Sequence, residues 1–177
     1  MSQTKLPEKR EDVYLYTPKC DYLGIKLRQG VLEIKWRYPD SNKKQFGSVV
    51  EGNIEKWKKW RCLDSSEESF SLQQISDNPV WIKVEKVRYS QLYTVVSKSP
   101  KAVSTDIDIN NGCSLELTNI VINGNSWWSI ALEAFGEDSK LKENLQATAN
   151  LVFSSYDSFP LQATNSYGYP SLLELSR

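Results

Sequence analysis

The sequence predicts one domain over residues 1–177, of the α+β class and mainly antiparallel β. We expect a barrel or a strongly curved sheet of about eight strands, with two helices outside it. Three observations predict this fold. Residues 23–37 alternate apolar and charged side chains around a Gln29-Gly30 turn, as in a two-residue β-hairpin. Residues 103–136 alternate in the same way around Asn-Gly dipeptides, and only two segments combine helical spacing with cap residues.

The strands and loops are predicted from local pattern, in chain order. Residues 1–10 are polar and expected to be loose. Loops are predicted at 38–45, which contains Pro-Asp-Ser-Asn, and at 64–78, which is rich in Ser, Glu and Gln. Asn111-Gly112 and Asn123-Gly124 are predicted hairpin turns. The expected strands cover residues 11–16, 23–28, 31–37, 47–51, 80–96, 104–109, 114–122 and 126–134.

Two helices are predicted from caps and apolar spacing. The first covers residues 53–63, where Asn53 is an N-cap, Glu55 lies in the first turn and basic residues follow toward the end. Its apolar stripe consists of Ile54, Trp57 and Trp60. The second helix covers residues 139–152, and a last helical turn is predicted at 171–175.

Composition excludes several classes of function. The chain has 22 basic and 22 acidic residues, so its net charge favours neither nucleic acid nor an anionic membrane surface. It has no histidine, which excludes Ser-His or Cys-His nucleophile pairs and histidine metal ligands. No apolar run approaches the roughly 20 residues of a membrane span. Three separated cysteines and no signal peptide favour a cytoplasmic protein with reduced thiols.

One face of the 23–37 hairpin carries the charged side chains of both strands. The two-residue turn sets Lys26 opposite Glu33, so the charges lie on one side of the pair. Such a face is too charged for a dry core, and it faces either bulk water or a wet cavity. If the apolar face lies under the helices, the charged face points into a polar lumen.

A lumen of this kind predicts a phosphate site. Converging lysines and arginines repel one another unless an anion or carboxylates offset their charge. Phosphate is the natural guest, because Arg binds it bidentately and Lys binds it as a point charge. Carboxylates at one end would hold Mg²⁺ or Mn²⁺, which bridges to phosphate oxygens. The candidate anion-binding residues are Lys26, Arg28, Lys35, Arg37, Lys86 and Arg88, and the candidate metal ligands are Glu116 and Glu133.

The order of these motifs resembles the CYTH family, the triphosphate tunnel proteins. Residues 12–37 resemble the family's Tyr strand, Thr-Pro turn and two basic strands, and VEKVRY at 84–89 resembles its K-x-R strand. Residues 113–136 are similar to its paired acidic strands, and SYGYPSLLEL at 166–175 is similar to its ending. The resemblance implies a tunnel barrel that binds triphosphate-type substrates and hydrolyses or cyclises them with a divalent metal. It assigns Lys26, Arg28, Lys35, Lys86 and Arg88 to the phosphate clamp and Glu116 and Glu133 to the metal.

The chain departs from this family in its acidic half. No E-x-E-x-K strand opens the chain, and Thr118 and Ala131 stand where further acids are expected. The chain matches the family's basic residues better than it matches the family's metal-binding acids. A degenerate member of this kind binds its anion with slow or absent turnover, because turnover depends on the metal.

Three functions follow from the sequence. The first is a metal-dependent triphosphate phosphohydrolase, and the second is a non-catalytic barrel that binds a small phosphorylated ligand. The third is a protein-interaction module, because alternating charge is also typical of the solvent face of an antiparallel sheet. In that case the charged faces are solvated and the tryptophans form a contact surface. A homodimer that completes the barrel is a further open alternative.

Overall fold

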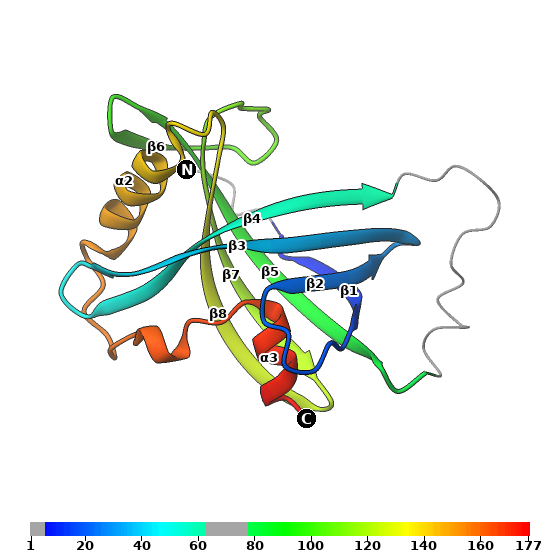
Figure 1. Cartoon of the computed structure of the whole chain (residues 1–177). Helices are drawn as coiled ribbons and strands as arrows, with labels where there is room; N and C mark the ends of the chain where they lie inside the picture. The colour runs from blue at the N-terminus through cyan, green and yellow to red at the C-terminus, as the bar shows by residue number, and fades with distance from the viewer. Residues whose placement is uncertain (1–5, 63–77) are drawn as a thin grey trace.

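The computed structural model describes residues 6–62 and 78–177. Within them a single antiparallel sheet of eight strands is followed by two α-helices and a short 3₁₀ helix (Figure 1). The elements are β1 (Glu8–Leu15), β2 (Leu23–Arg28), β3 (Val31–Phe46), β4 (Val50–Cys62), β5 (Trp81–Val96), β6 (Ser99–Val103), β7 (Gly112–Ile122), β8 (Asn125–Phe135), α2 (Leu141–Phe153), η1 (Ala163–Asn165) and α3 (Tyr169–Leu175).

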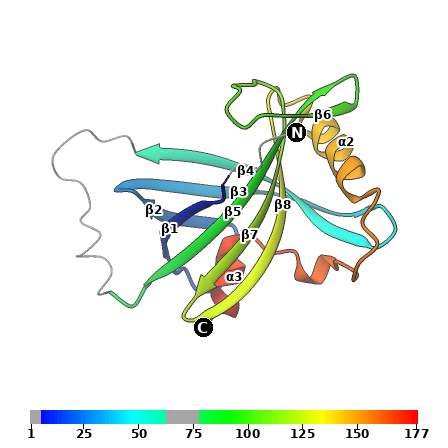
Figure 2. The same ribbon diagram turned by 180° about the vertical axis from the view of Figure 1, so that it is seen from behind.

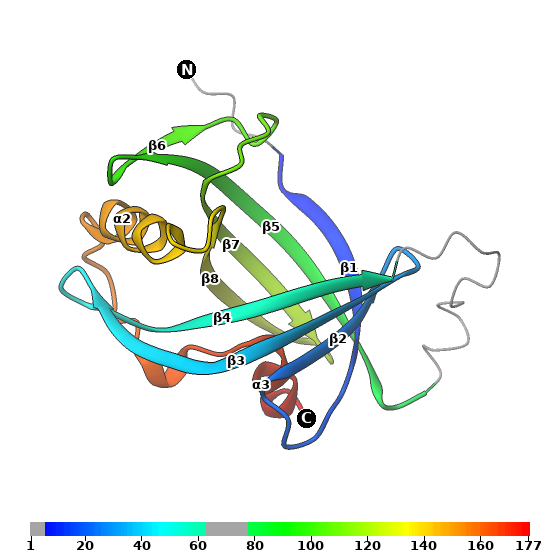
Figure 3. The same cartoon turned by 45° about the horizontal axis from the view of Figure 1, so that its top comes forward.

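The sheet curls into an open half-barrel. Its strand order is β4-β3-β2-β1-β5-β7-β8, with β6 paired to β5 beside this path. Seen from above, β3 and β4 lie on one side of the curl and β5, β7 and β8 lie on the other (Figure 3). The edge strands β4 and β8 do not pair with each other in the described residues, so the sheet is strongly curved rather than closed. The predicted fold class is confirmed in its curved-sheet form.

The hairpin that dominates the sequence is confirmed in register. Lys26 pairs with Glu33 and Arg28 pairs with Val31 across the β2–β3 turn. Gln29 and Gly30 have φ angles of 51° and 79°, as a two-residue turn of type I′ requires. The Asn123-Gly124 turn is confirmed in the same way, with φ angles of 50° and 78°. The predictions of the 139–152 helix and of a last helical turn are confirmed by α2 and α3.

The predicted helix at 53–63 and the predicted loop at 38–45 are both wrong, because β3 and β4 form one long hairpin. Residues 53–62 pair with β3, and Trp57 and Trp60 lie opposite Arg37 and Ile34 on different faces of the sheet. The register shifts between Arg37 and Ser41, so Pro39 falls in a bulge where its missing N–H removes no ladder bond. Non-local pairing here overrides the local helical pattern.

Four smaller predictions are corrected. The predicted strand at 104–109 is a turn region, and β6 at Ser99–Val103 takes its place. Gly112 is not a turn residue but lies within β7, where a Cβ would stand 2.1 Å from the Tyr93 carbonyl oxygen. Residues 47–49 form the β3–β4 turn rather than a strand, and β1 begins at Glu8, within the stretch expected to be loose. The predicted 64–78 loop lies outside the described residues except for its last residue.

The charged face of β2 is the inner, concave face, and α3 packs against it. We define the inner face as the one that carries Asp12, Lys26 and Lys86. Tyr169 of α3 stacks on Tyr14 at a centroid distance of 4.9 Å, and Leu173 joins a buried apolar cluster on the same face. From behind, β5, β7 and β8 lie in front of α3 (Figure 2). The expectation that helices roof the apolar face is therefore wrong for α3, because its aromatic and aliphatic side chains complement the apolar end of the inner face.

Helix α2 packs at the other end of the molecule. Its Ala149 and Phe153 form a second core cluster with Phe46 and Val50 from the tip of the β3–β4 hairpin, and Leu132 of β8 packs against that cluster. On the inner face, the apolar cluster around α3 occupies one end and leaves the middle to polar side chains. In the described part of the chain, no helix has the length and apolarity that crossing a bilayer requires.

Candidate functional site

Asp12 is the centre of a buried group of charges on the inner face. Its side chain is 0% exposed. The Oδ2 atom lies 2.8 Å from Lys86 Nζ and 3.2 Å from Lys26 Nζ, and the Oδ1 atom accepts a 2.8 Å hydrogen bond from Arg28 Nε. Strand β1 lies between β2 and β5, so its side chains on this face meet cations from both neighbours. One carboxylate therefore holds three basic side chains from two strands.

Glu33 is a second buried carboxylate on the same face. Only 3% of its side chain is exposed. Its Oε2 atom lies 3.3 Å from Lys26 Nζ, whereas its Oε1 atom lies 2.7 Å from Arg61 Nε and 3.5 Å from Lys59 Nζ. Glu33 pairs in register with Lys26 on one side and with Arg61 on the other. It thus connects the group around Asp12 to the edge strand β4.

Cations outnumber carboxylates in this group, which we call the charge cluster. Arg10 also belongs to it, since its Nε atom lies 3.9 Å from Asp12 Oδ2. Glu8 joins the cluster through Arg10, because its Oε1 atom lies 3.6 Å from Arg10 Nη1, but its side chain is 50% exposed. Six basic side chains then face two buried carboxylates and one half-exposed carboxylate, which leaves a formal excess of three positive charges. The members of the cluster are Asp12, Glu33 and Glu8 with Arg10, Lys26, Arg28, Lys59, Arg61 and Lys86.

The cluster has a closed floor and a solvent-facing rim. Lys86 and Lys26 belong to the floor, with side chains that are 1% and 9% exposed. The rim consists of Arg28, Lys59 and Arg61, whose side chains are 23%, 36% and 49% exposed. The floor cations are fixed by their carboxylates, whereas the rim cations still meet water.

Pairing with cations shifts the pKa values of the two buried carboxylates downward, against the effect of burial. Burial alone would raise the pKa of Asp12, but the Arg28 hydrogen bond and the charges of Lys86 and Lys26 outweigh it. These partners hold the pKa of Asp12 well below its usual range. The pKa of Glu33 is lowered to about 2, because the charges of Lys26 and Arg28 likewise overcome its burial. Both carboxylates are therefore ionised at neutral pH.

The buried lysines show the complementary shift. Burial lowers the pKa of Lys86 to about 7, and the charge of Asp12 offsets only part of this effect. Burial also lowers the pKa of Lys26 to about 8, again against the pull of Asp12. The attraction of the carboxylates therefore offsets only part of the cost of burying the two charged lysines.

Two tyrosines close the floor over Lys86. The Lys86 ammonium donates a 2.8 Å hydrogen bond to the Tyr14 hydroxyl oxygen and lies 3.8 Å from the ring centroid of Tyr169. Such a cation over an aromatic face is attracted by the ring quadrupole. Burial raises the pKa of both tyrosines, so each stays a neutral phenol. Helix α3 thus shields Lys86 from solvent through Tyr169.

The structure brings only part of the predicted anion site together. Lys26, Arg28 and Lys86 meet around Asp12, as described above. Lys35 lies farther along the face, 3.7 Å from Glu133, and the Arg88 guanidinium is held by Glu8 and Glu116.

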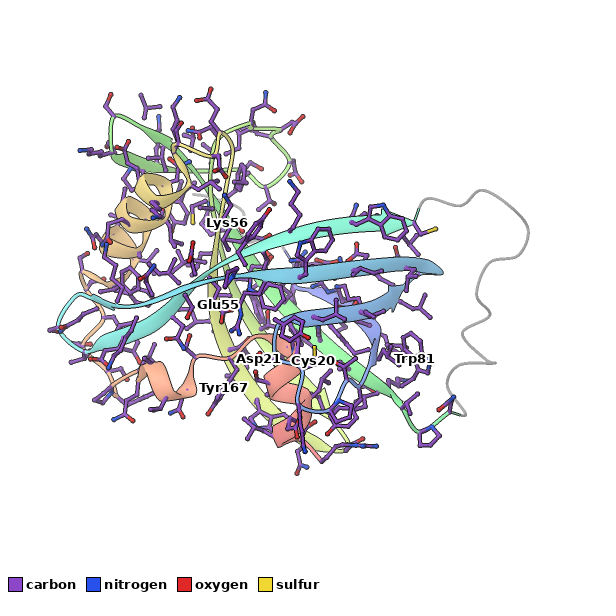
Figure 4. The ribbon with its side chains drawn as sticks, in the orientation of Figure 1. Cys20, Asp21, Glu55, Lys56, Trp81 and Tyr167 are labelled. Carbon is purple, nitrogen blue, oxygen red and sulfur yellow. The ribbon has the colours of Figure 1, made fainter. Side chains whose placement is uncertain are left out.

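Arg37 belongs to a separate group outside the charge cluster. It is held by Asp21 at 2.6 Å and by Glu55 at 2.5 Å. Figure 4 labels these two acids, which come from the segment before β2 and from β4. The six predicted cations therefore divide among several carboxylates rather than converge on one point.

The predicted metal ligands are both engaged by cations. Glu116 accepts a 2.6 Å bond from Arg88, and Glu133 lies 3.7 Å from Lys35. In the register of β7 and β8, Glu116 lies opposite Ala131 and Glu133 lies opposite Ser114, so the two acids are diagonal neighbours. No group of three or more His, Cys, Asp or Glu side chains that would hold a metal occurs in the part of the chain described. Bound Mg²⁺ or Mn²⁺ stays a prediction.

Sequence reasoning missed four important residues of the site. Lys59 and Arg61 were assigned to a helix, and Tyr169 lies far from the cluster in sequence. Asp12 alternates with Arg10 and Tyr14 in the pattern R-x-D-x-Y, which is the signal that places all three on one strand face. That pattern was available, but the strand pairing that surrounds Asp12 with cations was not.

The fold and the cluster define a class of protein: an antiparallel half-barrel whose inner face holds a cation-rich polar core. No known protein family, curated protein or solved structure matches the chain. The likeness to the CYTH family therefore stays a prediction from short motifs.

Proposed function

We propose that the inner face binds a small phosphorylated or polyphosphate-type anion at the rim of the charge cluster. The observation that supports this proposal is the charge excess, since six cations share two buried carboxylates and one half-exposed carboxylate. Arg28 and Arg61 present planar guanidinium groups, which suit the oxygens of a phosphate, and Lys59 adds a point charge between carboxylate and solvent. An anion at this rim offsets the excess without displacing Asp12.

The buried members of the cluster act as support in this proposal. Asp12 fixes Lys26 and Lys86, and these cations raise the positive potential at the rim without touching the ligand. An anion nearby stabilises the protonated lysines, so anion binding raises the pKa of Lys26 and Lys86. Near pH 8 the protein therefore takes up protons from the buffer when the anion binds. The measured heat of binding then depends on the ionisation enthalpy of the buffer.

Hydrolysis is slow or absent in this proposal. Glu116 and Glu133 would have to release Arg88 and Lys35 before they hold Mg²⁺ or Mn²⁺. Release of Glu116 leaves Arg88 with Glu8 alone, and release of Glu133 leaves Lys35 without its carboxylate, so both losses oppose metal binding. We place the protein in the cytoplasm, where small phosphorylated ligands occur and where its three free cysteines would stay reduced.

Inorganic triphosphate tests the proposal. We expect it to raise the thermal unfolding midpoint of the wild-type protein by ligand linkage, less so as salt increases. The variant Lys59→Ala/Arg61→Ala is expected to bind triphosphate at least about tenfold more weakly, and Arg28→Ala is expected to abolish the shift. Lys83→Gln, on the outer face, is the matched control and should bind like wild type. Phosphate release with Mg²⁺ or Mn²⁺ measures turnover in the same samples.

Two outcomes would overturn the proposal. One is a wild-type midpoint that does not move at any triphosphate concentration up to the millimolar range. The other is a shift of equal size in wild type and in Lys59→Ala/Arg61→Ala, which would place the anion elsewhere. Rapid phosphate release that depends on Mg²⁺ and is lost in Glu133→Gln would instead support the phosphohydrolase.

A further inference from the structure

The outer face of β5, β7 and β8 carries a row of exposed apolar side chains. Tyr89, Leu117 and Ile130 are consecutive partners in register across the three strands. Their exposed fractions are 44%, 42% and 39%, and Trp128 beside them is 62% exposed. The rings of Tyr89 and Trp128 stack at 6.5 Å. These four residues, which we call the outer patch, lie together on the side of β5, β7 and β8 that is opposite to the face covered by α3.

The outer patch lies in a region of the sheet without charge. The side chains that share this face alternate along residues 87–91, 115–121 and 126–132, and none of them is Asp, Glu, Lys or Arg. The inner face of the same strands carries Arg88, Glu116 and Glu133. A partner for the outer patch gains nothing from charge and must offer an apolar, neutral surface of its own.

Helix α2 covers one end of this face and stops there. Leu132, the next residue on the Trp128–Ile130 side of β8, packs against the cluster that contains Phe153. Beyond Leu132 no helix of the described chain covers this face, and the residues of the outer patch are exposed to solvent. Four large apolar side chains at this exposure are more than scattered surface residues, and such patches mark contact sites.

The two edges of the sheet give an independent observation. Edge strands are normally protected from pairing by lysines, prolines or bulges. Strand β4 follows this rule with Lys56, Lys58, Lys59 and Arg61. Strand β8 has no lysine, arginine or proline in 11 residues, pairs with β7 without a bulge, and carries Glu133 as its one charge. The unprotected edge is the one that adjoins the outer patch.

We propose that the outer patch is the interface of a homodimer. A second copy is the partner that fits, because its own outer patch is equally neutral and apolar and meets no charge of like sign. A two-fold axis near Trp128 and Ile130 packs each patch on its copy, as an isologous interface requires, and the two β8 edges then border the contact. The inner faces then point away from each other and stay open to solvent. This interface is independent of the proposed anion site.

The oligomeric state of the full chain tests the proposal. Light scattering after gel filtration, over protein concentrations from about 1 µM to 1 mM, should show a rise from the 20.3 kDa of one chain to twice that mass. Trp128→Glu and Leu117→Lys should shift this rise to at least about 100-fold higher concentration, because each buries a charge in an apolar interface. The control is Trp60→Glu, an equally drastic change at a 49% exposed tryptophan on the outer face of β4.

Hydroxyl-radical footprinting of the wild type provides a readout that does not depend on variants. Trp128 and Tyr89 should become protected as concentration rises, whereas Trp60 should not. A monomer throughout the concentration range would overturn the proposal. So would a dimer that Trp128→Glu leaves intact, or protection of Trp60 without protection of Trp128, since either places the contact elsewhere. Binding of a different protein to the patch of a strictly monomeric chain would also overturn it.

Discussion

The inner face of this sheet buries Asp12, Glu33 and Lys86, whereas the outer face of the same sheet exposes Leu117 and Trp128. Burial here follows the curl of the sheet and the position of α3, not the polarity of the side chains. Charged groups tolerate the inner face because each has partners of opposite sign within 4 Å. Apolar groups remain on the outer face because the described helices reach only one end of it.

The comparison teaches where the chain is sensitive to substitution. A buried ion pair adds little net stability over an apolar pair, but removal of one member leaves its partners uncompensated. An exposed pair contributes little in either direction, because water screens it. The same chemical change should therefore have very different effects on the two faces. Adjacent residues of β1 allow this comparison within one strand, because their side chains point to opposite faces.

The largest effect is expected from Asp12→Asn. The change keeps the shape of the side chain but removes the charge that holds Lys26, Arg28 and Lys86. We expect the free energy of unfolding to fall by about 3–5 kcal/mol, the usual loss when one member of a buried ion pair is removed. Urea denaturation followed by circular dichroism measures it. A loss below about 1 kcal/mol would show that the cluster is hydrated rather than buried.

A second prediction concerns the pH dependence that the buried lysines impose. The pKa of Lys86 is about 7 in the folded protein, below its ordinary value of 10.5, because burial disfavours the charged form. Between these values the unfolded chain binds more protons than the folded one, so stability rises with pH. We expect the free energy of unfolding to increase from pH 7 to pH 9, by at most about 1.4 kcal/mol per pH unit from this group. Lys26, with a pKa of about 8, acts in the same direction.

The variant Lys86→Met isolates this contribution. It removes the titrating group, so the rise in stability between pH 7 and pH 9 should be smaller than in wild type. Lys44→Met is the control, because Lys44 lies exposed on β3 and should leave the slope unchanged. Urea denaturation at pH 7, 8 and 9 gives the three slopes. Equal slopes in wild type and Lys86→Met would mean that Lys86 stays fully protonated in the folded protein throughout this range.

The fold class and the first hairpin were predictable because their signals are local. Alternation over residues 23–37 and the Gln29-Gly30 turn determine both the register and the face that each charge occupies. The same parity placed Lys26 and Arg28 together on the inner face. Lys86 was also correctly predicted to lie on the inner face, because the alternation of side chains along β5 is equally clear. Alternation within one strand does not show which other strands pair with it.

The errors arose where non-local pairing decides the structure. Ile54, Trp57 and Trp60 have helical spacing, yet these residues become a strand because β3 offers a partner along their whole length. That error removed Lys59 and Arg61 from the predicted site. Asp12 was not recognised as the central counter-ion, since its role depends on β1 lying between β2 and β5. Tyr169 depends on the packing of α3, which no local pattern specifies.

The smallest effect is expected from Glu11→Gln, the counterpart of Asp12→Asn one residue earlier in β1. Glu11 pairs with Lys83 at 2.6 Å, but the two side chains are 48% and 58% exposed on the outer face. We expect the free energy of unfolding to change by less than about 0.5 kcal/mol, because exposed ion pairs gain little over hydration. The same urea experiment measures both variants, so the difference between them reports the two faces directly. If Glu11→Gln were as damaging as Asp12→Asn, the outer side of β1 would be covered in solution, and the contrast between the faces would not hold for this strand.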